Sequence, residues 1–196
     1  MSSANRGGER QKFDLYETPK DPIERILERL QLKPTANLID PCSGSGNILK
    51  VIKQYYPSMN ICANELDPQH EESLSALHIP YKIKDFLQFT EEDVKFLTEG
   101  KSKFDYIFTN PPYAFAIEFI KKSLEFSDNV IMLLRLNFLE SKKRNEFLKN
   151  NTPDVYVLSN RPSFINGATD STAYAWFVWS AGGERSVGNL QILGLN

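Results

Sequence analysis

Short apolar runs alternate with amphipathic stretches along most of the chain. The apolar runs have the length of buried strands, and they predict strands at residues 36–40, 59–66, 81–86, 104–110 and 129–136. Between them, apolar residues recur at helical spacing or follow helix-starting residues, which predicts intervening helices. Repeated strand–helix units indicate an α/β fold with a Rossmann-like, doubly wound and mostly parallel sheet.

The two ends of the chain depart from this alternation. Before the first strand, Asp21 and Pro22 predict a helix, with Asp21 as its cap and Pro22 at the first helical position. After the fifth strand, a charged helix is expected at 140–149. The runs 155–158 and 174–179 then follow with no helix between them, so we expect an antiparallel hairpin that completes a seven-stranded sheet.

Composition narrows the class of protein. The 196 residues are 41% hydrophobic and 24% charged, which predicts one globular domain over 1–196, with residues 1–12 disordered. The net charge of −2 means that contact with a polyanion must come from a local basic patch. Cys42 and Cys62 have no paired His/Cys spacing, so we expect no metal site and no disulfide, as in a cytoplasmic protein. We expect no signal peptide and no membrane span.

The tetrapeptide Asn110-Pro111-Pro112-Tyr113 ends the run that begins at Phe104. Two prolines end a strand and stiffen the loop at its carboxyl end, where open α/β sheets bind ligands. The Asn110 side-chain oxygen and the Pro111 carbonyl can both accept hydrogen bonds from one amino group, and Tyr113 offers a ring for stacking. This combination suits the methylation of an amine on a planar base or amide. A plain Pro-Pro loop before a helix is the alternative.

Three further strand ends carry residues suited to a nucleoside. The first strand leads into the glycine-containing loop Asp40-Pro41-Cys42-Ser43-Gly44-Ser45-Gly46, which lacks the lysine of a phosphate-binding P-loop. The second strand ends at Glu65-Leu66-Asp67, where an acid can bind ribose hydroxyls. The third ends at Asp85-Phe86, where a carboxylate and a ring can meet an adenine. Each acid could instead cap a helix, but together the three strand ends indicate a nucleoside cofactor.

With these motifs the chain resembles the class I S-adenosylmethionine-dependent methyltransferases that act on adenine in DNA, from about Phe13 to Trp179. The resemblance implies S-adenosyl-L-methionine as cofactor. It implies that the loop from Asp40 to Gly46, the ribose acid Glu65 and the adenine-contacting Asp85 bind that cofactor. The segment that closes over the methionine part resembles Tyr16-Glu17-Thr18-Pro19, and its position before the loop matches the gamma order of motifs.

The same resemblance implies a flipped adenine held by the catalytic residues Asn110, Pro111, Pro112 and Tyr113. In related enzymes an aromatic residue lies on the other face of the base, and Phe164 is the candidate here, although it could equally fill core. Arg161 is a candidate phosphate ligand. The basic residues Lys142, Lys143 and Arg144 form a local patch that could meet DNA or a solvated face. Trp176 and Trp179 are assigned to core or edge packing.

Several substrates stay open at this point. No separate target-recognition domain is expected, and the same tetrapeptide occurs in enzymes that methylate adenine in RNA or a glutamine amide in release factors. Asp40-Pro41 favours the DNA group. A non-catalytic partner subunit with the same fold is a further alternative. By analogy, a short enzyme of this kind resembles a solitary methyltransferase of a bacterium or its phage. The sequence does not decide between a monomer and a homodimer.

Overall fold

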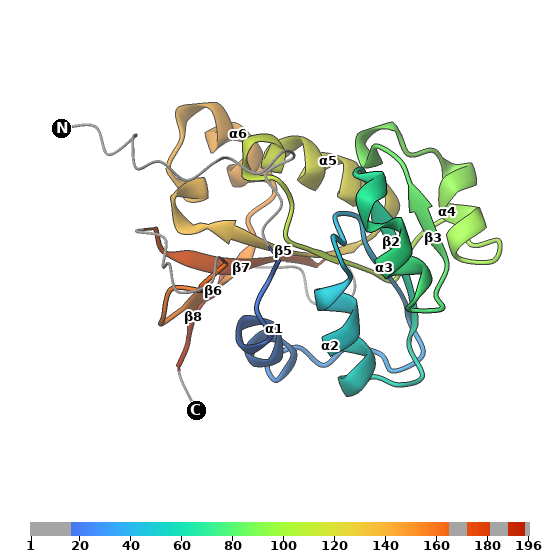
Figure 1. The fold of residues 1–196 in the computed structure, drawn as a ribbon. Coiled ribbons are helices and arrows are strands. Elements are labelled where there is room, and N and C mark those ends of the chain that lie inside the picture. The colour runs from blue at the N-terminus through green and yellow to red at the C-terminus, as the bar shows by residue number, and fades with distance from the viewer. Residues whose placement is uncertain (1–16, 165–171, 181–187, 195–196) are drawn as a thin grey trace.

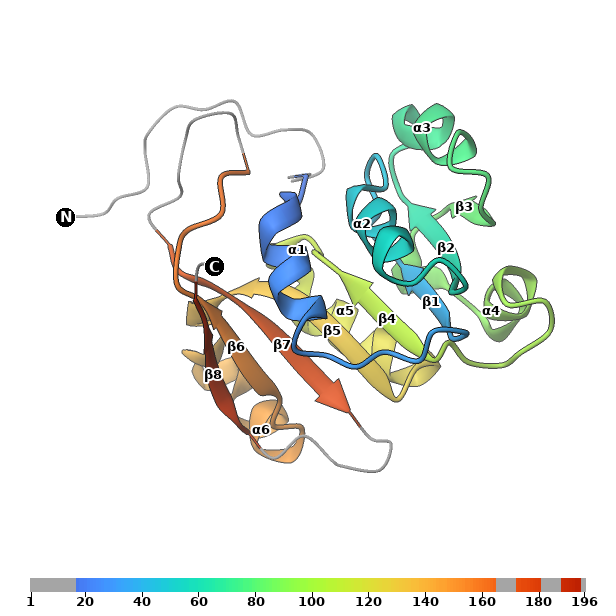
Figure 2. The ribbon, with the colours of Figure 1, turned by 90° about the horizontal axis from the view of Figure 1, so that it is seen from below.

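The computed structural model describes residues 17–164, 172–180 and 188–194, and within them it contains one eight-stranded sheet. Figures 1 and 2 show the sheet from two directions. The strands are β1 (Asn37–Asp40), β2 (Asn60–Glu65), β3 (Tyr81–Ile83), β4 (Tyr106–Thr109), β5 (Asn129–Arg135), β6 (Asp154–Leu158), β7 (Tyr174–Ser180) and β8 (Leu190–Leu193). The helices are α1 (Lys20–Leu27), α2 (Asn47–Tyr55), α3 (Glu71–Ser75), α4 (Glu91–Leu97), α5 (Ala116–Phe126) and α6 (Lys142–Asn150).

Strands β1 and β4 lie side by side in the middle of the sheet, and the later strands are added outward from them on opposite sides. The order is β3-β2-β1-β4-β5-β7-β6-β8, and β1 to β5 run parallel to one another. Strand β7 lies antiparallel between β5 and β6, and β8 is parallel to β6. Chain order proceeds outward from β1 in one direction and from β4 in the other. The carboxyl ends of β1 and β4 therefore form the switch point where such sheets bind ligands.

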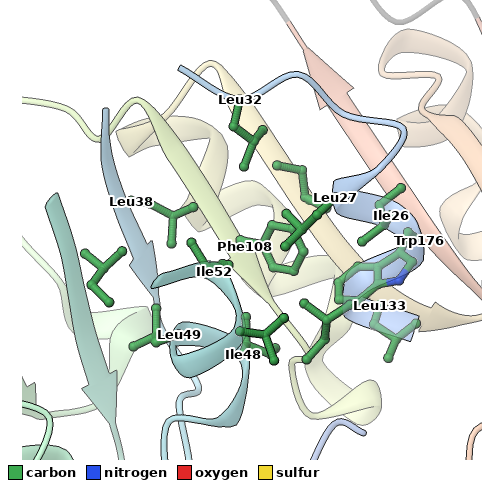
Figure 3. Packing of buried hydrophobic residues seen from close by; sticks show 14 of the residues in the cluster. Ile26, Leu27, Leu32, Leu38, Ile48, Leu49, Ile52, Phe108, Leu133 and Trp176 are labelled. Carbon is green, nitrogen blue, oxygen red and sulfur yellow. The ribbon is translucent and has the colours of Figure 1, made fainter. Parts of the chain in front are cut away.

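Helices cover both faces of the sheet because the central strands are apolar on both sides. Helices α1 and α2 lie on one face, and α5 and α6 lie on the other (Figure 1). On the first face, Phe108 of β4 and Trp176 of β7 pack with ring centroids 4.8 Å apart, among Ile26, Leu27 and other residues (Figure 3). A second buried cluster fills the opposite face. No helix among the described residues has the length and apolar character needed to cross a membrane.

The fold class and the predicted strands are confirmed, including antiparallel pairing of the last two predicted strands. The sequence analysis missed β8, an edge strand of only four residues in which Leu190 and Ile192 are 63% and 57% exposed. Trp176 and Trp179 are buried, as predicted. The range 1–12 lies outside the described residues.

The predicted start of the first helix was wrong. Helix α1 begins at Lys20, and Pro19 occupies the capping position without a side-chain cap. The Asp21 carboxylate instead accepts a hydrogen bond from Arg25, one turn further along the same helix. Between β2 and β3, a 3₁₀ turn (Pro68–His70) precedes α3, which ends at Ser75.

A buried carboxylate fastens α4 to the edge strand β3. Asp93 is 5% exposed, and its two oxygens lie 2.8 Å from Lys82 Nζ and 2.6 Å from Lys84 Nζ. It also accepts a hydrogen bond from the backbone nitrogen of Thr90, as a capping box requires. Burial opposes ionisation, but the two ammonium groups and Thr90 outweigh it and hold the pKa of Asp93 well below its usual range.

We predict that Asp93→Asn lowers the free energy of unfolding at neutral pH by about 3 kcal/mol, because two lysines lose their shared buried carboxylate. The pKa of Asp93 is lower in the folded protein than in the unfolded chain. Its stabilising effect is therefore complete above the unfolded pKa of about 3.9 and is lost as the pH falls further. Urea titrations at neutral pH and near pH 3 measure the free energy of unfolding of both proteins. The difference in this free energy between wild type and Asp93→Asn should be smaller at the lower pH.

The control is Glu91→Gln, which removes an exposed partner of Lys95 on the same helix and should change stability little at either pH. The role of Asp93 would be contradicted if Asp93→Asn lost no more stability than Glu91→Gln, or if its loss of stability were as large near pH 3 as at neutral pH.

Candidate active site

A pocket lies at the carboxyl ends of β1, β2 and β4, and its volume is about 730 Å³ including its open mouth. Its lining comes from the chain segment before α1, the loop after β1, the ends of β2 and β3, and the loop after β4. The lining residues are Glu17, Thr18, Asp40, Pro41, Cys42, Ser43, Gly44, Ser45, Asn47, Ile48, Asn64, Glu65, Leu66, Lys84, Asp85, Phe86, Asn110, Pro112 and Phe119.

Asp40 is the buried carboxylate at the floor of this region, with 0% exposure. Its Oδ1 accepts hydrogen bonds from Thr109 Oγ1 at 2.7 Å and from the backbone nitrogen of Cys42 at 3.0 Å. Its Oδ2 is buried and receives no hydrogen bond from the described residues. Burial raises the pKa of Asp40 to about 7, against the opposing effect of these two hydrogen bonds. The carboxylate therefore favours a cationic group in the pocket.

The glycine loop is shaped by contacts on both sides. The backbone nitrogen of Gly44 donates to Glu65 Oε2 at 2.8 Å, which ties the loop to the end of β2. Gly46 has a φ of +83°, and a Cβ at that position would lie 2.5 Å from Leu77 Cδ1. Gly46 is therefore favoured by its backbone conformation, which lets α2 begin at Asn47.

Glu65 is held in one orientation by backbone donors. Besides Gly44, the nitrogens of Leu66 and Asp67 donate to its Oε1 at 2.7 and 2.9 Å. Its side chain is 4% exposed and lines the pocket. Asp85 also lines the pocket, and it accepts from the nitrogen of Leu87 at 3.0 Å as the cap of a 3₁₀ turn. Asp85 therefore caps a turn, which was the alternative reading of this acid, and it also lines the pocket.

The pocket is acidic. Four carboxylate residues line it, and they are Glu17, Asp40, Glu65 and Asp85. The lining contains one basic residue, Lys84, whose ammonium group is paired with Asp93 at 2.6 Å. A ligand with a phosphate chain would meet repulsion here, whereas a nucleoside that carries positive charge would be attracted.

The loop after β4 brings the tetrapeptide to the same pocket. Asn110 and Pro112 contribute to the lining, and Asn110 Nδ2 donates to Thr18 Oγ1 at 3.1 Å. Pro111 is buried, and Tyr113 begins a 3₁₀ turn that leads into α5. The rigid loop therefore presents an amide group next to the acidic pocket.

Aromatic residues and one arginine surround Tyr113. The guanidinium carbon of Arg135 lies over the Tyr113 ring, 5.1 Å from its centroid, and Arg135 Nε donates to the Tyr174 hydroxyl at 3.4 Å. The Tyr174 ring is centred 5.8 Å from Tyr113 and 5.0 Å from Phe164. Phe164 packs partly against the core and also reaches the neighbourhood of the tetrapeptide through Tyr174.

The structure brings most of the predicted cofactor residues together. Nine of them line the pocket, namely Thr18, Asp40, Pro41, Cys42, Gly44, Glu65, Leu66, Asp85 and Phe86. Three other predicted cofactor residues are described by the structure but do not line the pocket. Pro19 and Gly46 lie at the starts of helices, and Asp67 caps a 3₁₀ turn. Tyr16 lies outside the described residues.

Of the predicted target residues, Arg161, Lys142 and Lys143 are exposed. Arg144 instead donates to the carbonyls of Phe138 at 2.7 Å and Asn137 at 3.1 Å, which belong to the 3₁₀ turn Leu136–Leu139 before α6.

Sequence reasoning missed several residues that shape the site. Asn64, which is 1% exposed, donates to the carbonyls of Pro41 and Lys84 and so joins two loops of the pocket. A buried amide within an otherwise apolar strand was the available signal. Arg135 and Thr109 carried no such signal, because their partners come from distant strands.

The sheet and the pocket have the arrangement that is found in solved methyltransferase structures. A solved modification subunit of a putative type I restriction enzyme from Vibrio vulnificus YJ016 has this fold with a TM-score of 0.62 and 13% identity, over 88% of this chain and 49% of that one. Two solved RNA methyltransferases, one of them putative, have it with TM-scores of 0.61 and 0.60, so the fold alone does not distinguish the substrates.

Sequence relatives are found among viral modification enzymes. The chain is 24% identical over 224 residues to the type II methyltransferase M.CvrRI of Paramecium bursaria Chlorella virus XZ-6E, across 90% of this chain and 56% of that protein. It is 30% identical over 105 residues to the modification methylase CviBIII of Paramecium bursaria Chlorella virus NC1A, across 52% of this chain and 26% of that protein. No family model matches the chain.

These relatives confirm the resemblance to S-adenosylmethionine-dependent DNA methyltransferases, and S-adenosylmethionine is the cofactor that they and the fold imply. The chain spans about half the length of the first curated relative and a quarter of the second. The pocket fits this cofactor, because it is acidic and is lined by Asp40, whose buried Oδ2 receives no hydrogen bond from the described residues. The described residues offer no group of three or more His, Cys, Asp or Glu that could hold a metal ion.

We predict that S-adenosylmethionine binds more tightly as the pH rises from about 6 to about 8. Asp40 has a pKa of about 7 in the free protein, and a sulfonium cation favours its ionised form, so binding below that pH releases a proton. Calorimetry in buffers of different ionisation enthalpy measures both the affinity and the proton release. The control ligand is S-adenosylhomocysteine, which lacks the sulfonium charge and should show a weaker dependence. Equal pH dependence for the two ligands would contradict this role of Asp40.

Proposed function

We propose that the protein transfers the methyl group of S-adenosylmethionine to the exocyclic amine of an adenine that is flipped out of DNA. The proposal rests on one juxtaposition: the Asn110–Tyr113 loop opens onto an acidic pocket that also contains Asp40 and Glu65. An amide acceptor thus lies beside a site suited to a cationic nucleoside. The sequence relatives, a viral type II methyltransferase and a viral modification methylase, support DNA as the substrate.

In this proposal the cofactor is held by the loop after β1, with Glu65 at the ribose and Asp85 and Phe86 at the adenine. The bound cofactor supplies an electrophilic methyl group. Asn110 Oδ1 and the Pro111 carbonyl accept hydrogen bonds from the target amine and aim its lone pair at that methyl group. Tyr113 stacks on the base, and Arg135 and Tyr174 hold the tyrosine ring.

The transfer needs little acid–base assistance. A nitrogen–carbon bond forms as the sulfur–carbon bond breaks, the sulfur keeps the electron pair, and the amine then loses a proton to water. Because the sulfonium activates the methyl group, the protein contributes orientation and electrostatic stabilisation.

Alternative methyl acceptors are adenine in RNA and a glutamine amide in a protein. A different kind of function, that of a non-catalytic partner subunit, is the further alternative. Transfer of labelled methyl to duplex DNA, to RNA and to protein separates these substrates. The proposal expects label in DNA, with the product identified as N6-methyladenine by digestion and mass spectrometry. Label confined to RNA or protein, or none in the presence of bound cofactor, would overturn it.

We predict that Asn110→Ala lowers kcat on DNA by roughly 100-fold or more, because the amine loses the acceptor that orients it. Cofactor affinity should change little, since Asn110 is one of many lining residues. Labelled-methyl transfer and calorimetry with the cofactor give the two quantities. A variant with nearly unchanged kcat would exclude Asn110 from the chemistry.

The exposed start of α6 is the candidate DNA-contacting surface. Lys142 and Lys143 follow the carboxyl end of β5, and therefore lie toward the edge of the sheet that carries the pocket. Lys121 of α5 lies near this helix, with its Nζ 5.8 Å from the centre of the Phe147 ring. Arg144 is engaged by the carbonyls of its own turn, so the two exposed lysines are the residues to test.

We predict that Lys142→Glu with Lys143→Glu weakens DNA binding and reduces its salt dependence, with log Kd against log salt falling in slope by about 2. The matched control reverses the exposed Lys33 and Lys103, which lie before β1 and β4 at the opposite edge of the sheet. Fluorescence anisotropy between about 50 and 200 mM salt measures both double variants. Equal effects in the two would exclude α6 from the DNA-contacting surface.

A further inference from the structure

The segment directly before α1 touches both functional loops. Glu17 accepts a hydrogen bond from Ser45 Oγ at 2.5 Å and one from Asn47 Nδ2 at 3.1 Å, at the end of the glycine loop and the start of α2. The next residue, Thr18, is 4% exposed and accepts from Asn110 Nδ2 at 3.1 Å. Two adjacent residues therefore connect the loop after β1 to the loop after β4.

The hydrogen bond to Thr18 has a consequence for the Asn110 amide. An asparagine side chain has a donor end and an acceptor end, and only the oxygen can accept from a substrate amine. With Nδ2 donating to Thr18 Oγ1, the amide is held beside the pocket and Oδ1 is the end that can accept from the substrate amine. A rotated amide would present donors to the hydrogens of an amine, which would repel it.

We propose that Thr18 is a positioning residue that holds the Asn110 side chain in place for methyl transfer. This inference rests on the proposed function, but it concerns a residue whose contact is with Asn110. Glu17 adds a coupling, because it fastens the same segment to Ser45 and Asn47 beside the cofactor pocket. The segment before α1 therefore contacts the loop after β1 through Glu17 and the loop after β4 through Thr18.

The position of this segment is itself determined by the far part of the sheet. Trp176 Nε1 of β7 donates to the carbonyl of Pro22 at 2.8 Å, and Arg25 donates to the carbonyl of Leu193 at 3.2 Å. Arg25 is 5% exposed and also bonds Asn160 at 2.5 Å. Helix α1 is therefore fixed against the antiparallel strands, and Thr18, two residues before it, is held opposite Asn110.

The test compares Thr18→Val, which keeps the shape and removes the hydroxyl, with Thr18→Ser, which keeps the hydroxyl. We expect Thr18→Val to lower kcat by roughly 10- to 100-fold, with the KM for DNA and the Kd for cofactor changed by less than about 3-fold. Thr18→Ser should retain most of the activity. The matched control is Thr98→Val, which removes a buried hydroxyl that donates to the Val94 carbonyl at 2.7 Å at the end of α4.

Equal losses of kcat in Thr18→Val and Thr98→Val would overturn the proposal, because they would indicate that Thr18 has a purely structural role. A loss of cofactor affinity as large as the loss of kcat would also overturn the proposal, because Thr18 would then act as a cofactor ligand. Unchanged kcat in Thr18→Val would do the same.

A second measurement keeps the proposal separate from the proposed function. The side-chain amide protons of Asn110 can be followed by nuclear magnetic resonance in the cofactor-bound protein, without any acceptor. Thr18→Val should shift these signals and speed their exchange with water, and Thr18→Ser should restore them. If the wild-type protein transferred no methyl group, the proposed function would fail while this readout still tested Thr18. Unchanged Asn110 signals in Thr18→Val would overturn the positioning role whatever the activity.

Discussion

The hydrogen bonds around Asp40 hold together the two loops on which the site depends. Asp40 is the last residue of β1. Its Oδ1 accepts hydrogen bonds from the backbone nitrogen of Cys42 in the glycine loop and from the hydroxyl of Thr109 at the end of β4. Because β1 and β4 are the neighbours at the switch point, one buried carboxylate fixes the spacing of the cofactor loop and the Asn110 loop. The cost of its burial appears as its raised pKa, and a cationic ligand would offset that cost.

Charge is divided between two regions of the site. Four carboxylates line the pocket, whereas the exposed lysines that could meet a polyanion lie at the start of α6. The net charge of −2 is therefore compatible with a nucleic-acid substrate, because the acidic groups gather around the nucleoside pocket and a basic patch lies elsewhere.

The antiparallel end of the sheet has a role beyond closing the fold. Strand β7 supplies Tyr174 next to Tyr113 and Trp176 beneath α1, and β8 supplies a carbonyl for Arg25. The segment that carries Thr18 is thus supported by residues more than 130 positions away in the chain. A helix of eight residues would be marginal alone, and here its position follows from tertiary packing.

The sequence by itself determined the order of strands and helices, and it identified the loops that meet at the pocket. Apolar periodicity marks buried strands, and residues at their carboxyl ends must gather at one edge of a parallel sheet, so Asp40, Glu65, Asp85 and Asn110 could be grouped before any coordinates.

Only the tertiary structure decided which partners these residues have. The contacts of Thr18 with Asn110, of Arg135 with Tyr113 and of Thr109 with Asp40 join residues that lie far apart in the chain, and no local pattern encodes such pairs. Strand β8 has only four residues, too few for a clear periodic signal, and its pairing with β6 identifies it as a strand.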